Sequence, residues 1–314
     1  MDLYSFFEDF VKSDSKILVN LKKNEPIAPK TTFKIGGNAE IFAEPSDIYS
    51  LVQILKFVIK EKIKFFVLAG GSNIVFTDGV FSGIVISLSK ISSIKIQNQN
   101  EKNVFVECLC GVSMANLVNF ATENDLWGVQ FFAGLPGFIS GAVFMNARCF
   151  EKEISEIFES AQYFDKTDFK IKTQDFCKTD WEYKKSPFQD KNKIILSVVF
   201  RLQKKDSIFH EDLILENKKY INERKSRGHF SFPSAGSVFK NNRDFGFPSG
   251  KIIDDCGLKS KQIGKAQIAP FHANFIINLG GAFQKDVKDL VDFTIQEVKK
   301  QKGFTLEPEI IFVE

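Results

Sequence analysis

The sequence predicts an α+β fold, with helices and strands mixed along the chain and no regular βαβα alternation. Short strand-like apolar runs are broken by glycine pairs, and helical periodicity recurs at irregular intervals. The chain has 314 residues, 44% of them hydrophobic, which is enough to bury a sizeable core in two domains. Because a highly charged stretch follows Leu202, we expect one domain over residues 1–203 and a second over residues 204–314.

The overall composition excludes several classes of protein. A net charge of +3 is too balanced for a dedicated nucleic-acid binder, although it allows a local basic pocket. No apolar run is long enough to span a membrane, and the N-terminus lacks the features of a secretory signal. The five cysteines are odd in number and do not form a zinc-binding pattern, which favours free thiols in a reducing cytoplasm. Nothing in the sequence predicts an oligomeric state.

The first part of the chain is expected to contain helices and short strands. Apolar residues at helical spacing from Leu3 to Val11 predict an opening helix, and a polar segment follows up to Thr31. A glycine pair at Gly36-Gly37 precedes a short strand over residues 40–43, and Ser46 is the expected N-cap of the next helix. Further expected elements are a strand that starts at Lys64 and breaks at Gly70-Gly71, a strand at 83–88, and a hairpin of 92–97 and 104–109. A helix over 113–124 and strands at 160–164 and 194–202 should follow.

The second part is expected to begin with a charged helix over residues 206–225. A short helix over 250–256 should stop at Gly257, and a long amphipathic helix should stop at Gly303, since glycine commonly ends helices. The last predicted element is a strand over residues 307–313.

The stretch Lys64–Ile74 runs from a buried strand into the loop Gly70-Gly71-Ser72-Asn73. Two successive glycines allow positive φ and a close approach to a ligand, and their N–H groups can line an anion-binding concavity. The loop is therefore a candidate phosphate cradle, while an ordinary glycine turn is the alternative. Neither a G-x-G-x-x-G helix start nor a Walker lysine is present.

A second unusual stretch is rich in small residues over Gly134–Ala147. Their spacing indicates that one face lies against something flat, or else that a helix packs closely on its neighbour.

Taken together, seven stretches occur in the order seen in the UDP-N-acetylenolpyruvoylglucosamine reductases (MurB), the flavin enzymes of early peptidoglycan synthesis. The chain resembles this family over nearly its whole length. The stretches are Thr32–Ala39, Ala69–Asn73, Gly134–Ala147, Pro233–Asn241, Gln262–Gln267, His272–Asn278 and Glu307–Glu309.

This resemblance implies an FAD-binding domain of the vanillyl-alcohol-oxidase type and a C-terminal α+β substrate-binding domain. Only the predicted helix 206–225 separates Leu202 from the Ser237 motif, as in the shorter subgroup that lacks a tyrosine-bearing loop. The implied reaction uses NADPH and a non-covalent FAD to reduce UDP-N-acetylglucosamine enolpyruvate. The residues that the resemblance assigns to FAD are Ala69, Gly70, Gly71, Ser72, Asn73, Gly134, Gly137, Ser140, Gly141, Ala142 and Asn146.

Three side chains match the catalytic positions of the family. Ser237 stands at the proton donor and Glu309 at the catalytic glutamate, although by composition alone they are typical of a turn serine and an exposed strand-end carboxylate. Lys184 stands where the family has arginine; it keeps the charge but loses the bidentate fork. Lys185 or Arg148 can therefore contribute charge to the substrate carboxylate.

Weaker matches concern the binding of the UDP-sugar by Lys240, Asn241 and His272. His272 is equally consistent with a packed strand histidine.

Two other functions stay open. The first is a different flavin oxidoreductase of this fold, although these often attach FAD covalently and no histidine lies in residues 60–80. The second is a non-catalytic binding relative, which only the lysine at position 184 favours.

Overall fold

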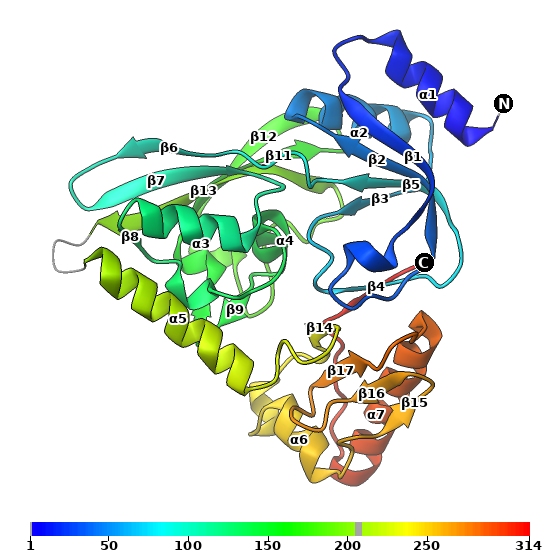
Figure 1. Ribbon diagram of the computed structural model, residues 1–314, viewed down its shortest axis with the longest axis vertical. Helices are drawn as coiled ribbons and strands as arrows, with labels where there is room; N and C mark the ends of the chain where they lie inside the picture. The colour runs from blue at the N-terminus through cyan, green and yellow to red at the C-terminus, as the bar shows by residue number, and fades with distance from the viewer. Residues whose placement is uncertain (1, 205–208) are drawn as a thin grey trace. The chain divides into compact units, whose positions relative to one another are not determined.

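The computed structural model describes residues 2–204 and 209–314 (Figure 1). Their contacts form two compact units, each built from several stretches of sequence. Two segments from the N-terminal third of the chain are grouped with its C-terminal part. The first unit comprises Met1–Lys23, Ile41–Gly70 and Gly83–Asn222, and the second Asn24–Glu40, Gly71–Ser82 and Glu223–Glu314.

The first unit contains an antiparallel sheet in the order β12-β11-β13-β7-β6, with β8 added to β13 (Figure 1). Helices α3 and α4 pack on it, and Leu117 and Val143 join buried residues of β7 and β13 in one core. The predicted hairpin is confirmed, and so is the predicted helix over residues 113–124, which is α3 with Ser113 as its N-cap. The elements are β6 (Ile94–Gln99), β7 (Asn103–Leu109), α3 (Met114–Glu123), β8 (Leu126–Trp127), α4 (Ile139–Phe144), β9 (Arg148–Cys149), β10 (Lys152–Glu153), β11 (Phe158–Asp165), β12 (Lys170–Asp175) and β13 (Lys193–Lys204).

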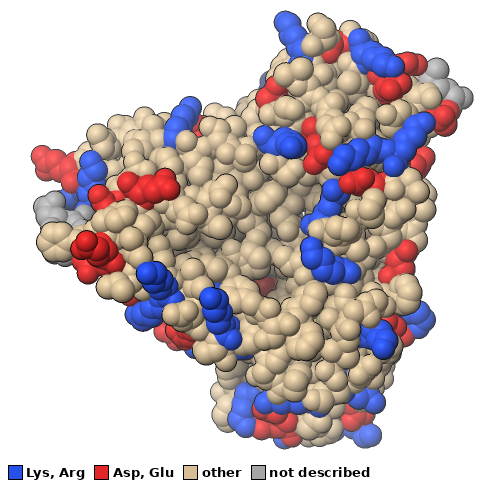
Figure 2. All heavy atoms as spheres, viewed as in Figure 1, with Lys and Arg blue, Asp and Glu red and all other residues tan. Residues whose placement is uncertain are grey.

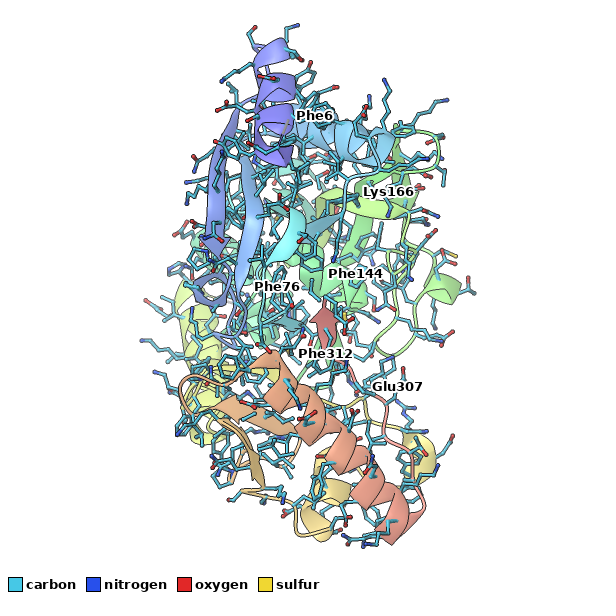
Figure 3. All side chains as sticks on the ribbon, turned by 90° about the vertical axis from the view of Figure 1, so that its right-hand side faces the viewer. Phe6, Phe76, Phe144, Lys166, Glu307 and Phe312 are labelled. Atoms are coloured by element: carbon cyan, nitrogen blue, oxygen red, sulfur yellow. The ribbon has the colours of Figure 1, made fainter. Side chains whose placement is uncertain are left out.

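A second sheet, in the order β1-β2-β5-β3, packs against the helices α1 and α2. The rings of Phe10 and Phe57 stack with centroids 3.9 Å apart, and Phe6 lies 5.3 Å from Phe57 (Figure 3). The predicted opening helix is therefore confirmed, with its aromatic face on α2. The elements are α1 (Leu3–Ser13), β1 (Val19–Pro26), β2 (Asn38–Pro45), α2 (Ile48–Lys60), β3 (Phe65–Leu68) and β5 (Phe81–Ser87).

Helix α5 (His210–Ser226) carries the chain into the second unit; the predicted helix start at Asp206 lies outside the described residues. The second unit contains a sheet in the order β14-β17-β16-β15, covered by α6 and α7. Helix α7 ends at Gly303 in the left-handed conformation, as predicted. Strand β18 pairs in parallel with β4, and Phe312 and Phe76 mark these strands in Figure 3. The elements are β4 (Ile74–Phe76), β14 (Ser234–Ser237), α6 (Ser249–Asp255), β15 (Gln262–Ile263), β16 (Ala266–Ile268), β17 (Phe275–Asn278), α7 (Gln284–Lys302) and β18 (Ile311–Val313).

The structure corrects four local expectations. Strands β1 and β12 form where the polar sequence predicted none; both are edge strands, which bury little and therefore show little apolar alternation. The N-cap of α2 is Asp47, whose Oδ1 accepts from Ser50 N at 2.7 Å, and Ser46 lies one residue before the cap. The final strand is confined to β18. Short 3-10 helices, which the sequence did not predict, lie at Ala28–Lys30, Gln130–Phe132, Ile154–Glu156, Lys178–Asp180 and Arg243–Phe245.

Charged side chains of both signs are interspersed over the face drawn in Figure 2. A search of residues 2–204 and 209–314 finds no helix long and apolar enough to cross a membrane. In the same residues, no three His, Cys, Asp or Glu side chains are grouped so that they could hold a metal ion.

Candidate functional site

In the first unit, two of the predicted cofactor-binding segments meet through their glycines. A Cβ atom on Gly70 would lie 2.4 Å from Gly137 Cα and 2.7 Å from Phe138 N. Gly137 also has a positive φ of 109°, a conformation that other residues rarely adopt. Glycine at both positions is therefore required for the two backbones to approach this closely. This accounts for a glycine in each of the two segments, 69–73 and 134–147.

Helix α4 contains three small residues in succession, Ser140, Gly141 and Ala142. Ser140 is buried, and its Oγ donates to Cys110 O at 2.6 Å. Gly141 and Ala142 are partly exposed, and a Cβ atom on Gly141 would meet only Ala69 Cβ within 4 Å, at 3.7 Å. The stretch 134–147 is thus not explained by tight helix packing around Gly141. A surface of this kind fits a planar ring system such as the isoalloxazine of FAD.

Asn146 lies directly after this helix and is fully buried, with φ at 42°. Its Nδ2 donates to Glu182 O at 2.9 Å and to Glu153 Oε2 at 3.2 Å, and its Oδ1 accepts from Ser155 N at 3.3 Å. The side chain thus joins the end of α4 to the turn that starts at Glu182.

The turn that carries Lys184 is fastened to α4. Ser186 Oγ donates to Phe144 O at 2.8 Å, and Gln189 Nε2 donates to Phe144 O at 3.1 Å and to Lys184 O at 2.8 Å. Lys184 has a left-handed backbone with φ at 59°, which is uncommon for a residue with a side chain. The structure therefore brings Lys184 to the same end of α4 as Asn146.

The two other cations proposed near Lys184 differ in their surroundings. The Arg148 guanidinium lies 5.7 Å from the ring of Tyr183, next to Lys184 in the chain, in a cation–π contact. Lys185 Nζ is 2.8 Å from Glu182 Oε2 in an exposed ion pair, which opposes its charge. Of these two, Arg148 is the better placed to add positive charge beside Lys184.

The chain passes into the second unit between Gly70 and Gly71. Gly71 has φ at 60°, and a Cβ atom there would lie 2.6 Å from Lys30 O. Thr32 N donates to Gly71 O at 3.1 Å, while Thr32 Oγ1 donates to Ser234 O at 2.7 Å. Thr32 thus links the glycine loop to the Ser237 motif, a role that sequence reasoning missed although the stretch 32–39 was recognised.

Ser237 and Glu309 come together on neighbouring extended segments. Glu309 N donates to Val238 O at 2.7 Å, directly after Ser237. On its other side, Glu309 O accepts from Asn73 Nδ2 at 3.1 Å, and Ile311 N donates to Asn73 O at 3.0 Å. The predicted catalytic pair and the end of the glycine loop therefore form one hydrogen-bonded arrangement within the second unit.

The predicted substrate-binding residues Lys240 and Asn241 follow in the same segment. Lys240 N donates to Glu307 O at 2.9 Å, and Lys240 Nζ lies 2.5 Å from Glu307 Oε1 (Figure 3 labels Glu307). Asn241 Oδ1 accepts from Ser249 N at 2.9 Å, at the start of α6. Pro308 has no N–H, and it forms a single bridge with Phe239, which explains why the regular strand starts only at residue 311.

His272 and His229 form an aromatic cluster with Phe275 in the second unit. The ring centroids of the two histidines lie 4.5 Å and 4.9 Å from that of Phe275. His272 Nδ1 accepts from Asn274 N at 3.2 Å, so this histidine is held inside the protein as well as being a candidate ligand. Burial lowers the pKa of both rings, and Arg227 adds to the effect.

We expect His229 to make the protein less stable in mild acid. Burial, Arg224 and His272 lower its pKa from 6.5 to about 4, so the unfolded state binds a proton first. The free energy of unfolding should fall as the pH drops through 6.5 and level off below about pH 4. Denaturant titrations at several pH values should show that the free energy of unfolding falls less steeply with decreasing pH in His229→Phe than in wild type. The same dependence on pH in both proteins would contradict this.

Comparison with known proteins gives a consistent set of matches. Residues 39–167 match the model of an FAD binding domain, and residues 228–313 match that of the UDP-N-acetylenolpyruvoylglucosamine reductase C-terminal domain. The UDP-N-acetylenolpyruvoylglucosamine reductase of Treponema denticola is 44% identical over 301 residues, 92% of each chain. That of Borreliella burgdorferi is 40% identical over 297 residues, 94% of this chain and 95% of its own. The crystal structure of the Thermus caldophilus reductase superposes with a TM-score of 0.75 at 26% identity, covering 95% of this chain and all of that one.

Proposed function

The chain belongs to the family of UDP-N-acetylenolpyruvoylglucosamine reductases, and from this premise we infer how its residues carry out the reaction. It is an FAD-containing oxidoreductase that uses NADPH to reduce UDP-N-acetylglucosamine enolpyruvate to UDP-N-acetylmuramate, in peptidoglycan precursor synthesis. When bound, FAD would supply the redox chemistry of hydride transfer between NADPH and the enolpyruvyl group. The protein binds and orients the reactants and manages charge and protons.

For the cofactor, the proposal assigns the glycine loop to the pyrophosphate and α4 to the ring. The N–H groups of Gly71, Ser72 and Asn73 would face the phosphate oxygens, as in other backbone anion sites. Gly141 and Ala142 would lie under the planar ring, where a side chain much larger than a methyl group would take up its space. Ser140 and Asn146 hold α4 and its end in place through their buried hydrogen bonds. Ala69, Gly70, Gly134 and Gly137 complete the proposed set through their backbone.

For the substrate, the proposal assigns one residue to each chemical demand. Hydride arrival at C3 places negative charge on C2 and, by delocalisation, on the carboxylate. Lys184 would neutralise the carboxylate, Ser237 would protonate C2, and Glu309 would stabilise the transient charge distribution or relay the proton. The observation that carries this part is the 2.7 Å hydrogen bond from Glu309 N to Val238 O, which ties the glutamate next to the serine.

The UDP-sugar would be bound by Lys240, Asn241 and His272. Lys240 then exchanges its ion pair with Glu307 for a substrate phosphate. We further propose that the protein works in the cytoplasm, a location with which its free cysteines agree, on a nucleotide sugar rather than on nucleic acid or a membrane.

A single assay separates this function from its rivals. Purified yellow protein should oxidise NADPH rapidly only when UDP-N-acetylglucosamine enolpyruvate is present. Oxidation of a sugar alcohol with reduction of oxygen would favour another flavin oxidoreductase. Tight binding of the enol ether without turnover would favour a catalytically weakened relative.

Gly141 offers the sharpest test of the cofactor assignment. We expect Gly141→Leu to yield folded protein with little flavin absorbance, because the added side chain occupies the proposed ring position. Gly141→Ala is the matched control: its Cβ makes only an ordinary 3.7 Å contact, and alanine favours a helix by roughly 1 kcal/mol over glycine. Full flavin absorbance in folded Gly141→Leu would refute the assignment. Gly71 is less suitable, since any side chain there strikes Lys30 O.

A further inference from the structure

The segment that follows Ser237 is held by a side chain in place of a regular strand ladder. The pairing of β14 with β17 is irregular between Ser234 and Ser237. Beyond it, Asn274 Oδ1 accepts from Phe239 N at 2.9 Å, and Asn274 Nδ2 donates to Phe239 O at 2.8 Å. Asn274 O also accepts from Val238 N at 2.8 Å. One residue thus makes three hydrogen bonds to the two residues after Ser237.

These hydrogen bonds are shielded from solvent. Asn274 is 5% exposed and Phe239 is 2% exposed, so a lost partner would leave a buried polar group unsatisfied. Asparagine combines a donor and an acceptor at the end of a short side chain, which lets it bond both backbone groups of one residue. Aspartate has the same shape but, when ionised, only accepts.

A second asparagine acts on the partner segment. Asn73 Nδ2 donates to Glu309 O at 3.1 Å, and Asn73 O accepts from Ile311 N at 3.0 Å. Glu309 N in turn donates to Val238 O. The segments of Ser237 and Glu309 therefore bond to each other. On its other side, the Ser237 segment is bonded by Asn274, and the Glu309 segment is bonded by Asn73.

We propose that Asn274 and Asn73 are positioning residues that fix the register of Ser237 against Glu309. That this positioning matters for the reaction rests on the proposed function. That the two segments are held in place rests on the hydrogen bonds alone. Asn274 determines where the serine hydroxyl lies because only Val238 separates Ser237 from the bonded Phe239. Asn73 does the same for the glutamate, through the carbonyl group of Glu309 itself.

Asn278 provides a matched control on the same strand β17. It is 4% exposed; its Nδ2 donates to Phe33 O at 3.1 Å, and its Oδ1 accepts from Gly280 N at 2.8 Å and from Ala282 N at 3.1 Å. Its bonds fasten other loops of the second unit. Asn278→Ala should therefore lower the melting temperature as Asn274→Ala does, without disturbing Ser237.

The kinetic test compares the two half-reactions by stopped-flow absorbance. Asn274→Ala should slow oxidation of the reduced flavin by the enol ether about 100-fold, the scale of loss expected when a reacting group is misplaced by about 1 Å. Flavin reduction by NADPH should change little, and the solvent isotope effect on the slowed step should rise, because proton delivery then limits it. Asn73→Ala should damage the same half-reaction, with rates taken per bound flavin because Asn73 also belongs to the proposed pyrophosphate cradle. Asn274→Asp replaces the alanine variant if that one does not fold, because its carboxyl keeps the bond from Phe239 N and, while protonated, can also donate to Phe239 O.

A second readout is independent of activity. Hydrogen exchange at the amides of Val238, Phe239 and Lys240 in the protein without substrate should accelerate in Asn274→Ala and stay unchanged in Asn278→Ala. An equal kinetic loss in both variants, or faster exchange without a kinetic loss, would overturn the positioning role. If wild-type flavin is not reoxidised by the enol ether, the proposed function fails, and the exchange experiment still decides whether Asn274 fixes the segment.

Discussion

Replacing Ser237 by alanine is expected to slow the oxidation of reduced flavin by the enol ether by roughly two to four orders of magnitude, the usual loss for a positioned acid. FAD binding and flavin reduction by NADPH should stay nearly intact. The physical reason is that C2 becomes basic as hydride reaches C3, so that a proton is needed at almost the same moment. Stopped-flow absorbance of the two half-reactions measures this directly.

Two further variants define the role of the serine. Ser237→Cys should recover part of the rate, because a thiol is a stronger acid with a similar reach. Glu309→Gln should damage the same half-reaction, because it removes the carboxylate proposed to stabilise the transient charge or relay the proton, while the main-chain bond to Val238 O is kept. Equal losses in both half-reactions of Ser237→Ala would mean that the serine only shapes the loop, and Glu309 would become the first candidate for the acid.

The second large effect is expected at Lys184. Lys184→Ala should slow reoxidation by the enol ether about 100-fold or more, as when one donor to a developing negative charge is removed, and should slow NADPH-driven reduction much less. Alanine is no worse suited than lysine to a φ of 59°, so the fold should persist. Lys184→Arg should be tolerated or improved, because guanidinium can bind a carboxylate with two parallel hydrogen bonds.

Lys185 is the natural control for this experiment. It carries the same charge one position later, but it is paired with Glu182 in an exposed contact, so Lys185→Ala should change either half-reaction little. An unchanged reoxidation rate in Lys184→Ala would contradict the assignment. A large loss in Arg148→Ala would then move the role to the guanidinium that lies over Tyr183.

The sequence predicted elements well where local signals agree. Helix α7 has an apolar stripe and ends at Gly303, and α3 has Ser113 at its N-cap, so periodicity and capping point to the same boundaries. The edge strands β1 and β12 were missed, since they bury little and their side chains do not alternate clearly. Their position is determined by neighbours in the sheet, which local sequence does not encode.

The candidate site was predicted through the family resemblance and hardly at all through individual residue patterns. Ser237 looks like a turn serine, and Glu309 looks like an exposed carboxylate beside a proline. What brings them together is pairing between segments distant in sequence. The roles of Thr32 and Asn274 were missed for the same reason, because an isolated threonine or asparagine gives no sign of its partner. The supporting hydrogen bonds of Asn146 became visible only in the structure.

The hydrogen bond between Asn73 and Glu309 has a consequence for biosynthesis. Its partners are 236 positions apart in the chain, so at typical translation rates roughly 10–50 seconds separate the appearance of the first from that of the second. During that interval Phe33, Ile35 and Val75 lack the C-terminal residues with which they share a core. The nascent chain must keep these apolar side chains from aggregating until its last strand leaves the ribosome. Folding of this unit is therefore expected to be post-translational, and dependence on a chaperone that holds the N-terminal segments would follow from its topology.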